Sequence, residues 1–137
     1  MANQDRYGIL LTGTISVLGA AEELVISADD DIVLLGNISL SHSASDLTVQ
    51  SDRFVFAEAT LNVPDALKIL GGIELDGTDL GAANSRGSSI CLGATGVLNT
   101  TAAGSSITLR GSKDVDAFMP IVAGGQIGAN GITWAGD

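Results

Sequence analysis

Two successive stretches of 23 residues decide the fold: residues 14–36, TISVLGAAEELVISADDDIVLLG, and residues 37–59, NISLSHSASDLTVQSDRFVFAEA. When the second stretch is placed under the first, the same residue occurs at five positions: Ile15/Ile38, Ser16/Ser39, Ala21/Ala44, Leu24/Leu47 and Asp29/Asp52. A fixed period of this length is typical of a solenoid, in which each repeat forms one turn and stacks on the turn before it. The two stretches therefore predict stacked turns.

Each repeat contains a short motif of an apolar residue, any residue and a second apolar residue, followed by a polar or glycine-containing break. The motif occurs at residues 15–17, 24–26, 32–34, 38–40, 47–49, 54–56, 61–63, 67–69, 73–75, 90–92 and 107–109. Alternation of this kind predicts strands with one buried face. Strands of three residues are short for a β-sandwich, whose strands usually have about 5–6 residues.

The number of motifs in each repeat indicates the architecture. Three motifs occur in every 19–23 residues, which corresponds to one turn of a three-sided parallel β-helix. We therefore expect an all-β fold, a short three-sided parallel β-helix with an extended glycine-rich C-terminal segment. A β-sandwich or jelly roll is the alternative, although neither would repeat its strands in threes.

The regularity of the pattern divides the chain into three regions. We expect residues 1–13 to form an N-terminal arm and residues 14–80 to form the repetitive β-helical turns. The period weakens from residue 81, where GAANSRGSS (81–89) is loop-like. Residues 81–137 are therefore expected to be an irregular β region that ends in a C-terminal contact segment.

Composition and charge exclude several classes of function. The chain has 6 Lys and Arg against 16 Asp and Glu, a net charge of −10, so it lacks the basic surface that nucleic acids or anionic membranes require. A single cysteine excludes an internal disulfide and a cysteine-based zinc site. Residues 1–80 carry the whole net charge, whereas residues 81–137 are neutral overall. Two interpretations are open. Either a partner protein covers the neutral half, or the acidic residues of the first half only serve to keep the chain soluble.

The residues that could carry chemistry have structural interpretations. His42 is the only histidine and lies in a polar loop, where a solvated turn residue is expected rather than a general base. Cys91 lies between Ile90 and Leu92, so its side chain should face away from theirs, and no basic cluster near it would lower its pKa. We expect no catalytic residue and no cofactor.

Two acidic groups could gather oxygen ligands for calcium. One is Asp29–Asp31, and the other comprises Glu74, Asp76 and Asp79. Neither has the spacing of an EF-hand loop, and aspartate is common in turns between strands. We therefore expect no metal site.

The apolar residues near the C-terminus are candidates for subunit contacts. Residues 118–137 are neutral apart from the final aspartate and rich in glycine, which allows close backbone approach. Trp134 could anchor this segment in a neighbouring subunit or cover the last turn of its own chain. The predicted contact residues are Phe118, Met119, Ile121, Val122, Ile127, Ile132 and Trp134.

A short, acidic, cysteine-poor β-helical chain that carries the segment PIVAGGQIGANGITWAG (120–136) resembles bacteriophage capsid decoration (cement) proteins. The resemblance implies a non-enzymatic structural protein on the exterior of the virion, a homotrimer whose partner is the major capsid protein. The chain is also similar to short β-helical stretches of tail fibres and spikes, so a fibre or glycan-binding module is an alternative function. A small β-helical enzyme is the second alternative. No functional residue is carried over from these families.

Overall fold

The structure is a computed structural model that describes residues 7–81, 88–123, 126–127 and 132–135. These residues form strands and no helix. The strands are β1 (Tyr7–Leu11), β2 (Ile15–Val17), β3 (Glu23–Ala28), β4 (Asp31–Leu34), β5 (Ile38–Leu40), β6 (Asp46–Ser51), β7 (Val55–Ala57), β8 (Leu61–Val63), β9 (Ala66–Gly71), β10 (Ser88–Leu92), β11 (Leu98–Thr100), β12 (Ser106–Gly111), β13 (Asp114–Ala117), β14 (Ile121–Ala123), β15 (Gln126–Ile127) and β16 (Ile132–Ala135).

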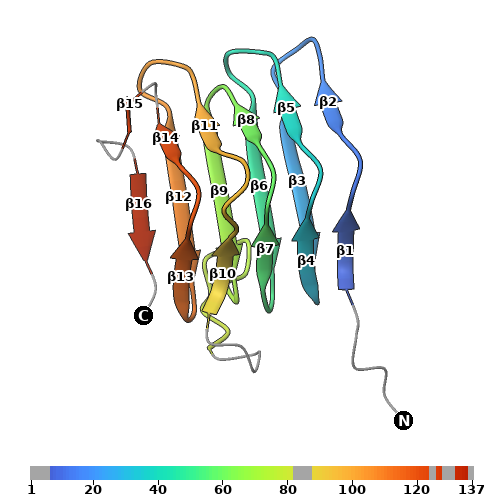
Figure 1. The fold of residues 1–137 in the computed structure, drawn as a ribbon, viewed down its shortest axis with the longest axis vertical. Helices are drawn as coiled ribbons and strands as arrows, with labels where there is room; N and C mark the ends of the chain where they lie inside the picture. Colours follow the sequence, from blue (N-terminus) through green and yellow to red (C-terminus); the bar gives the residue numbers. More distant parts are fainter. Residues whose placement is uncertain (1–6, 82–87, 124–125, 128–131, 136–137) are drawn as a thin grey trace.

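Three sheets run along the stack (Figure 1). Sheet A has the order β1-β4-β7-β10-β13, sheet B the order β15-β14-β11-β8-β5-β2, and sheet C the order β16-β12-β9-β6-β3. Successive turns pair in parallel, and among the described strands β15 alone pairs antiparallel, with β14. The chain is therefore a β-solenoid of about five turns, which confirms the three-sided parallel β-helix predicted from the sequence rather than a β-sandwich.

The strand register places equivalent residues of successive turns above one another. In sheet B, Ile15 pairs with Ile38 and Ile38 with Leu61. In sheet C, Leu24 pairs with Leu47 and Leu47 with Leu67. The alignment of residues 14–36 with residues 37–59 thus gives the correct register, because each turn of the solenoid occupies one period of the sequence.

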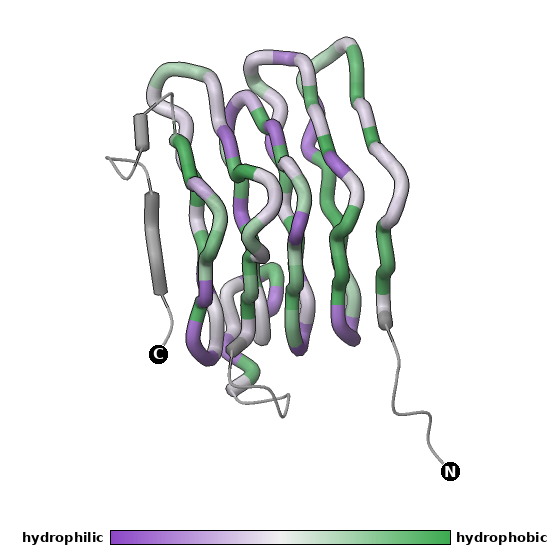
Figure 2. Tube along the Cα trace, viewed as in Figure 1, coloured by the Kyte–Doolittle hydropathy of each residue, from purple (hydrophilic) through white to green (hydrophobic). Residues whose placement is uncertain are grey.

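The core lies inside the three sheets and contains the outer members of most apolar motifs. The motif at residues 54–56 is an exception, because the strand is shifted by one residue: Val55 and Ala57 of β7 are fully buried and Phe56 is the outward residue between them. In the motif at residues 73–75, Ile73 is buried but Leu75 is 56% exposed. Ile32, Leu34, Ile38, Leu47 and Leu61 have no exposed surface. Ile15 and Leu24, in the first turn, are partly buried and pack against the same core. Figure 2 shows hydrophobic residues along most of β1 and β4, whereas the turns at the lower edge of the view are mainly hydrophilic. The motif therefore separates an apolar interior from a mixed outer surface.

The stack is longer than the regular part of the sequence. Strand β1 lies within residues 1–13 and pairs with β4, so part of the expected N-terminal arm belongs to the first described turn. At the other end, β10–β14 continue the three sheets as far as Ala123, within the region expected to be irregular. The period is lost there because the connection from β9 to β10 is longer than its equivalents, yet β10 still pairs with β7.

The long connection also explains one strand that does not form. The motif at residues 73–75 predicts a strand, but Ile73 makes only an isolated antiparallel bridge, with Asp79. Ile73 is fully buried, and its carbonyl oxygen accepts a hydrogen bond of 2.8 Å from Nε2 of Gln50. The segment that follows β9 therefore leaves the solenoid and forms a small loop beside sheet C.

Polar side chains and glycine hold the corners between the sheets. The buried hydroxyl of Ser51 accepts hydrogen bonds from the backbone N–H groups of Arg53 and Phe54, at 2.9 and 3.0 Å, and donates one to the carbonyl oxygen of Asp30. At another corner, Gly96 has a φ of 115°, and a Cβ there would meet the carbonyl oxygen of Ala59. Only glycine combines that conformation with such close packing.

Candidate functional site

His42 lies exposed in the turn between β5 and β6, as expected from the sequence. Its Nδ1 atom accepts a hydrogen bond of 3.1 Å from the backbone N–H of Ala44, and its carbonyl oxygen accepts one of 2.9 Å from the N–H of Ser45. Both bonds are internal to the turn. The histidine therefore orders the loop that begins β6.

The acidic turn before β4 contains a basic partner. Nε of Arg53 lies 3.7 Å from a carboxylate oxygen of Asp30 and 3.7 Å from one of Asp31. Arg53 belongs to the next turn of the solenoid, so these ion pairs connect successive turns at one corner. The carboxylates at this corner are thus neutralised in part by the chain itself.

The second acidic group belongs to the loop after β9. Oδ1 of Asp76 accepts a hydrogen bond of 2.9 Å from the N–H of Thr78, and Oδ1 of Asp79 accepts one of 2.7 Å from Gly81. Hydrogen bonds from the side chain and backbone of Thr78 lower the pKa of Asp76. Both aspartates therefore form turns within the loop. In the part of the chain that the structure describes, no group of three or more His, Cys, Asp and Glu residues could hold a metal ion.

Cys91 points away from the core, as expected, because its neighbours Ile90 and Leu92 are fully buried. Desolvation by burial is the main cause that raises the pKa of its thiol, and the carboxylates of Asp116 and Glu58 raise it further. The thiol is therefore kept protonated and weakly nucleophilic at neutral pH.

The outer face of sheet A carries an apolar row across four strands. Leu10 pairs with Val33, Val33 with Phe56, and Phe56 with Cys91. These residues alternate with core residues, so their side chains point outward. Leu10 is 52% exposed, and the row ends at Asp116, which pairs with Cys91.

A second outward row directly follows the last residues of β4, β7, β10 and β13. It contains Leu35, Glu58, Gly93 and Phe118, whose backbone N–H groups continue the ladders between turns. Leu35 is 47% and Phe118 is 68% exposed. We call the outward residues of both rows the sheet A face: Leu10, Val33, Leu35, Phe56, Cys91 and Phe118 with the acids Glu58 and Asp116.

The predicted contact residues near the C-terminus have different environments. Met119 is 5% and Ile121 is 8% exposed, and both belong to the core of their own chain. Phe118 is exposed, and Val122 is half-buried on sheet B. Ile127 belongs to β15 and Ile132 and Trp134 to β16, which pairs with β12, but their side chains lie outside the described part of the structure. The segment therefore continues the solenoid, and the prediction of subunit contacts concerns mainly Phe118 and Val122 among the described side chains.

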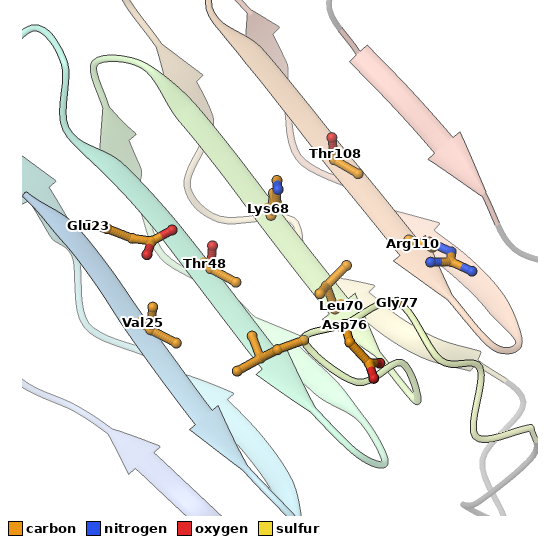
Figure 3. A pocket seen from close by; sticks show the side chains of 10 residues that line it. Glu23, Val25, Thr48, Lys68, Leu70, Asp76, Gly77, Thr108 and Arg110 are labelled. Atoms are coloured by element: carbon orange, nitrogen blue, oxygen red, sulfur yellow. The ribbon is translucent and has the colours of Figure 1, made fainter.

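A groove of about 460 Å³ lies on the outer face of sheet C (Figure 3). Its floor comes from outward residues of β3, β6, β9 and β12, and the loop after β9 forms one wall. The residues that line it are Glu23, Val25, Thr48, Lys68, Leu70, Leu75, Asp76, Gly77, Thr108 and Arg110. We call this the sheet C groove.

Sequence analysis alone identifies neither the sheet A face nor the sheet C groove. The signal that could find both is the middle residue of each motif, because the middle residues of successive turns stack on the outer surface. That signal gives Val33 and Cys91, and likewise Thr48 and Lys68. It does not give Phe56, because the motif at residues 54–56 is one residue out of register with β7. It does not give the wall of the groove, which depends on how the loop after β9 folds.

Comparisons with protein-family models, with curated proteins and with solved structures found no match to this chain. Within the described ranges, no helical segment has the length and hydropathy that a membrane crossing requires.

Proposed function

We propose that this chain is a non-enzymatic structural protein of a virion, a homotrimer that decorates the capsid exterior and attaches to the major capsid protein. The observation that carries the proposal is the sheet A face. Leu10, Leu35 and Phe118 are all about half exposed or more on the outer side of sheet A, and large exposed apolar side chains on one side of a protein commonly mark a protein contact. The resemblance to decoration proteins supplies the kind of assembly.

The form of the molecule supports a scaffold role. A solenoid has a rigid, regular side and two ends, and its stability comes from contacts between neighbouring turns. The exposed sheet faces are therefore free to bind other proteins without any change of fold. In the proposed trimer, the sheet A faces of three copies pack together around the threefold axis. The C-terminal strands then lie at one end of the assembly, where they can contact the capsid.

Sedimentation velocity tests the trimer. The wild-type chain is expected at three times its mass of 13.8 kDa. Leu35→Asp places a charge in the sheet A face and should give monomers with an unchanged far-UV circular dichroism spectrum. Leu18→Asp is the matched control, because Leu18 is 81% exposed but lies in the turn after β2. A monomeric wild type, or a trimeric Leu35→Asp variant, would contradict the proposal.

Immunogold electron microscopy tests the location. Particles purified from the source culture should carry the label on the outside of the head when an antibody against this chain is used. Label confined to tails would instead favour the fibre or glycan-binding alternative. An absence of label from all particles would contradict a virion role.

A further inference from the structure

The sheet C groove contains two cations on neighbouring strands. Lys68 lies on β9 between Thr48 and Thr108, which are its partners in the neighbouring strands (Figure 3). Arg110 lies on β12, two residues further along than Thr108. From a strand spacing of ~4.8 Å and a rise of ~3.3 Å per residue, the Cα atoms of Lys68 and Arg110 are about 8 Å apart. Both side chains are long enough to converge on one anionic group.

Neither of these two cations forms an ion pair within the part of the chain that the structure describes, whereas Arg53 is paired with two aspartates. Lys68 is exposed and Arg110 is half-buried. A chain with a net charge of −10 has acids enough to neutralise them. Two acids, Glu23 and Asp76, also line the groove, but neither pairs with Lys68 or Arg110, which leaves both cations able to bind an external anion.

The loop after β9 leaves room for Arg110. Gly77 has a φ of 92°, and a Cβ added there would lie 3.2 Å from Nη1 of Arg110. The loop can thus fold against the guanidinium group because a glycine stands at this point. The neighbouring carboxylate of Asp76 is held by Thr78 instead of pairing with Arg110.

The remaining lining residues define the ligand. Thr48 and Thr108 offer hydroxyl groups, and Val25, Leu70 and Leu75 offer aliphatic surface. Glu23 and Asp76 also line the groove, where they disfavour an extended polyanion but can accept hydrogen bonds from hydroxyl groups. None of the lining residues is aromatic, so a neutral sugar would find no ring for stacking.

We propose that the sheet C groove binds a carboxylated saccharide. Lys68 and Arg110 bind the carboxylate of the sugar through charge-assisted hydrogen bonds, which are stronger than those between neutral groups. Thr48 and Thr108, with the two carboxylates that line the groove, bind sugar hydroxyls, and the aliphatic residues contact the less polar side of the ring. The groove volume of about 460 Å³ is in the range of sites for small ligands. Sheet C is a different side of the solenoid from sheet A, so the groove stays accessible in the proposed trimer.

Titration with trigalacturonate, followed by backbone amide NMR shifts, tests the proposal. Shifts are expected on β9 and β12, and maltotriose, a neutral trisaccharide, should cause none at the same concentration. Lys68→Gln and Arg110→Gln should each weaken binding about tenfold, which corresponds to ~1.4 kcal/mol. Lys113→Gln is the matched control, because it removes the same charge from the turn after β12, outside the groove lining.

Three results would overturn the proposal: no shift with trigalacturonate, equal shifts with maltotriose, or equal weakening by Lys113→Gln. The last result would show binding through net charge alone. The variant Leu35→Asp should leave this titration unchanged, because Leu35 lies on the sheet A face. The experiments therefore distinguish a failure of the trimer proposal from a failure of the saccharide-binding proposal.

Discussion

Single polar side chains at the corners determine whether successive turns can close. The Ser51 hydroxyl satisfies two backbone N–H groups and one carbonyl oxygen, all of which are near the corner between sheets C and A. On sheet B, the half-buried middle residues of β8 and β11 link successive turns instead, where Nδ2 of Asn99 donates to Oδ1 of Asn62 at 2.8 Å. Buried polar groups without such partners would destabilise the fold, so these residues are constrained even though they lie outside the apolar core.

Cys91 gives a prediction at the same scale. Its pKa is raised mainly by burial and further by Asp116 and Glu58, so thiolate formation, followed by ultraviolet absorbance, should occur at higher pH than in the urea-unfolded chain. Glu58→Gln should lower the pKa only in part, because burial remains, whereas the control Glu22→Gln on an exposed residue of the chain before β3 should leave it unchanged. A thiol that titrates alike in the folded and unfolded chain would contradict this environment.

The sign of the linked stability effect follows from the raised pKa. The folded state holds the thiol proton more tightly than the unfolded state does. This contribution to stability is complete below the ordinary pKa of cysteine and is lost as the pH rises through the pKa of the folded state. The free energy of unfolding of the wild type should therefore fall more steeply in the alkaline range than that of Cys91→Ser, measured by urea denaturation.

At the scale of the strands, the sequence period predicts register well where turns have equal length. Ile15 and Ile38, or Leu24 and Leu47, are 23 residues apart and pair in the structure. Leu67 and Ile107 also pair, although 40 residues separate them, because the loop after β9 adds length without displacing β10. The sequence period alone cannot reveal such an insertion, because the period is interrupted there. The insertion becomes visible only from the pairing of β10 with β7 in the structure. The outer rows were predictable in principle from the register, but the wall of the sheet C groove was not.

Leu47 tests the register directly. It is fully buried in β6 between Leu24 and Leu67, so Leu47→Ala should lower the free energy of unfolding by about 2–5 kcal/mol. Leu47→Asp should prevent folding, because it buries an unpaired charge. Val25→Ala is the matched control, because Val25 is an aliphatic residue on the outer face of sheet C and is 42% exposed. Its free energy of unfolding should change by less than about 1 kcal/mol. Urea denaturation measures all three, and similar effects of Leu47→Ala and Val25→Ala would show that the register is wrong.

At the scale of the whole molecule, net charge and apolar surface act in opposite directions. Each chain carries a net charge of −10, so three copies repel one another. The sheet A face contributes apolar contact, but Glu58 and Asp116 lie on it and no base does. The proposed trimer must therefore be stabilised by burial of apolar residues against electrostatic repulsion, which predicts a definite response to salt.

Raising the salt concentration should strengthen the trimer, because the Debye length falls from about 10 Å at 0.1 M to about 3 Å at 1 M and screens repulsion between the acidic chains. Glu58→Gln removes one of those charges from the sheet A face and should strengthen association already at low salt, with a smaller response to added salt. Glu22→Gln makes the same change at an exposed position before β3 and should have a much smaller effect. Sedimentation equilibrium of the three proteins measures the association constants. If salt weakens the trimer, attractive ion pairs hold it together, and the apolar sheet A face is not the contact.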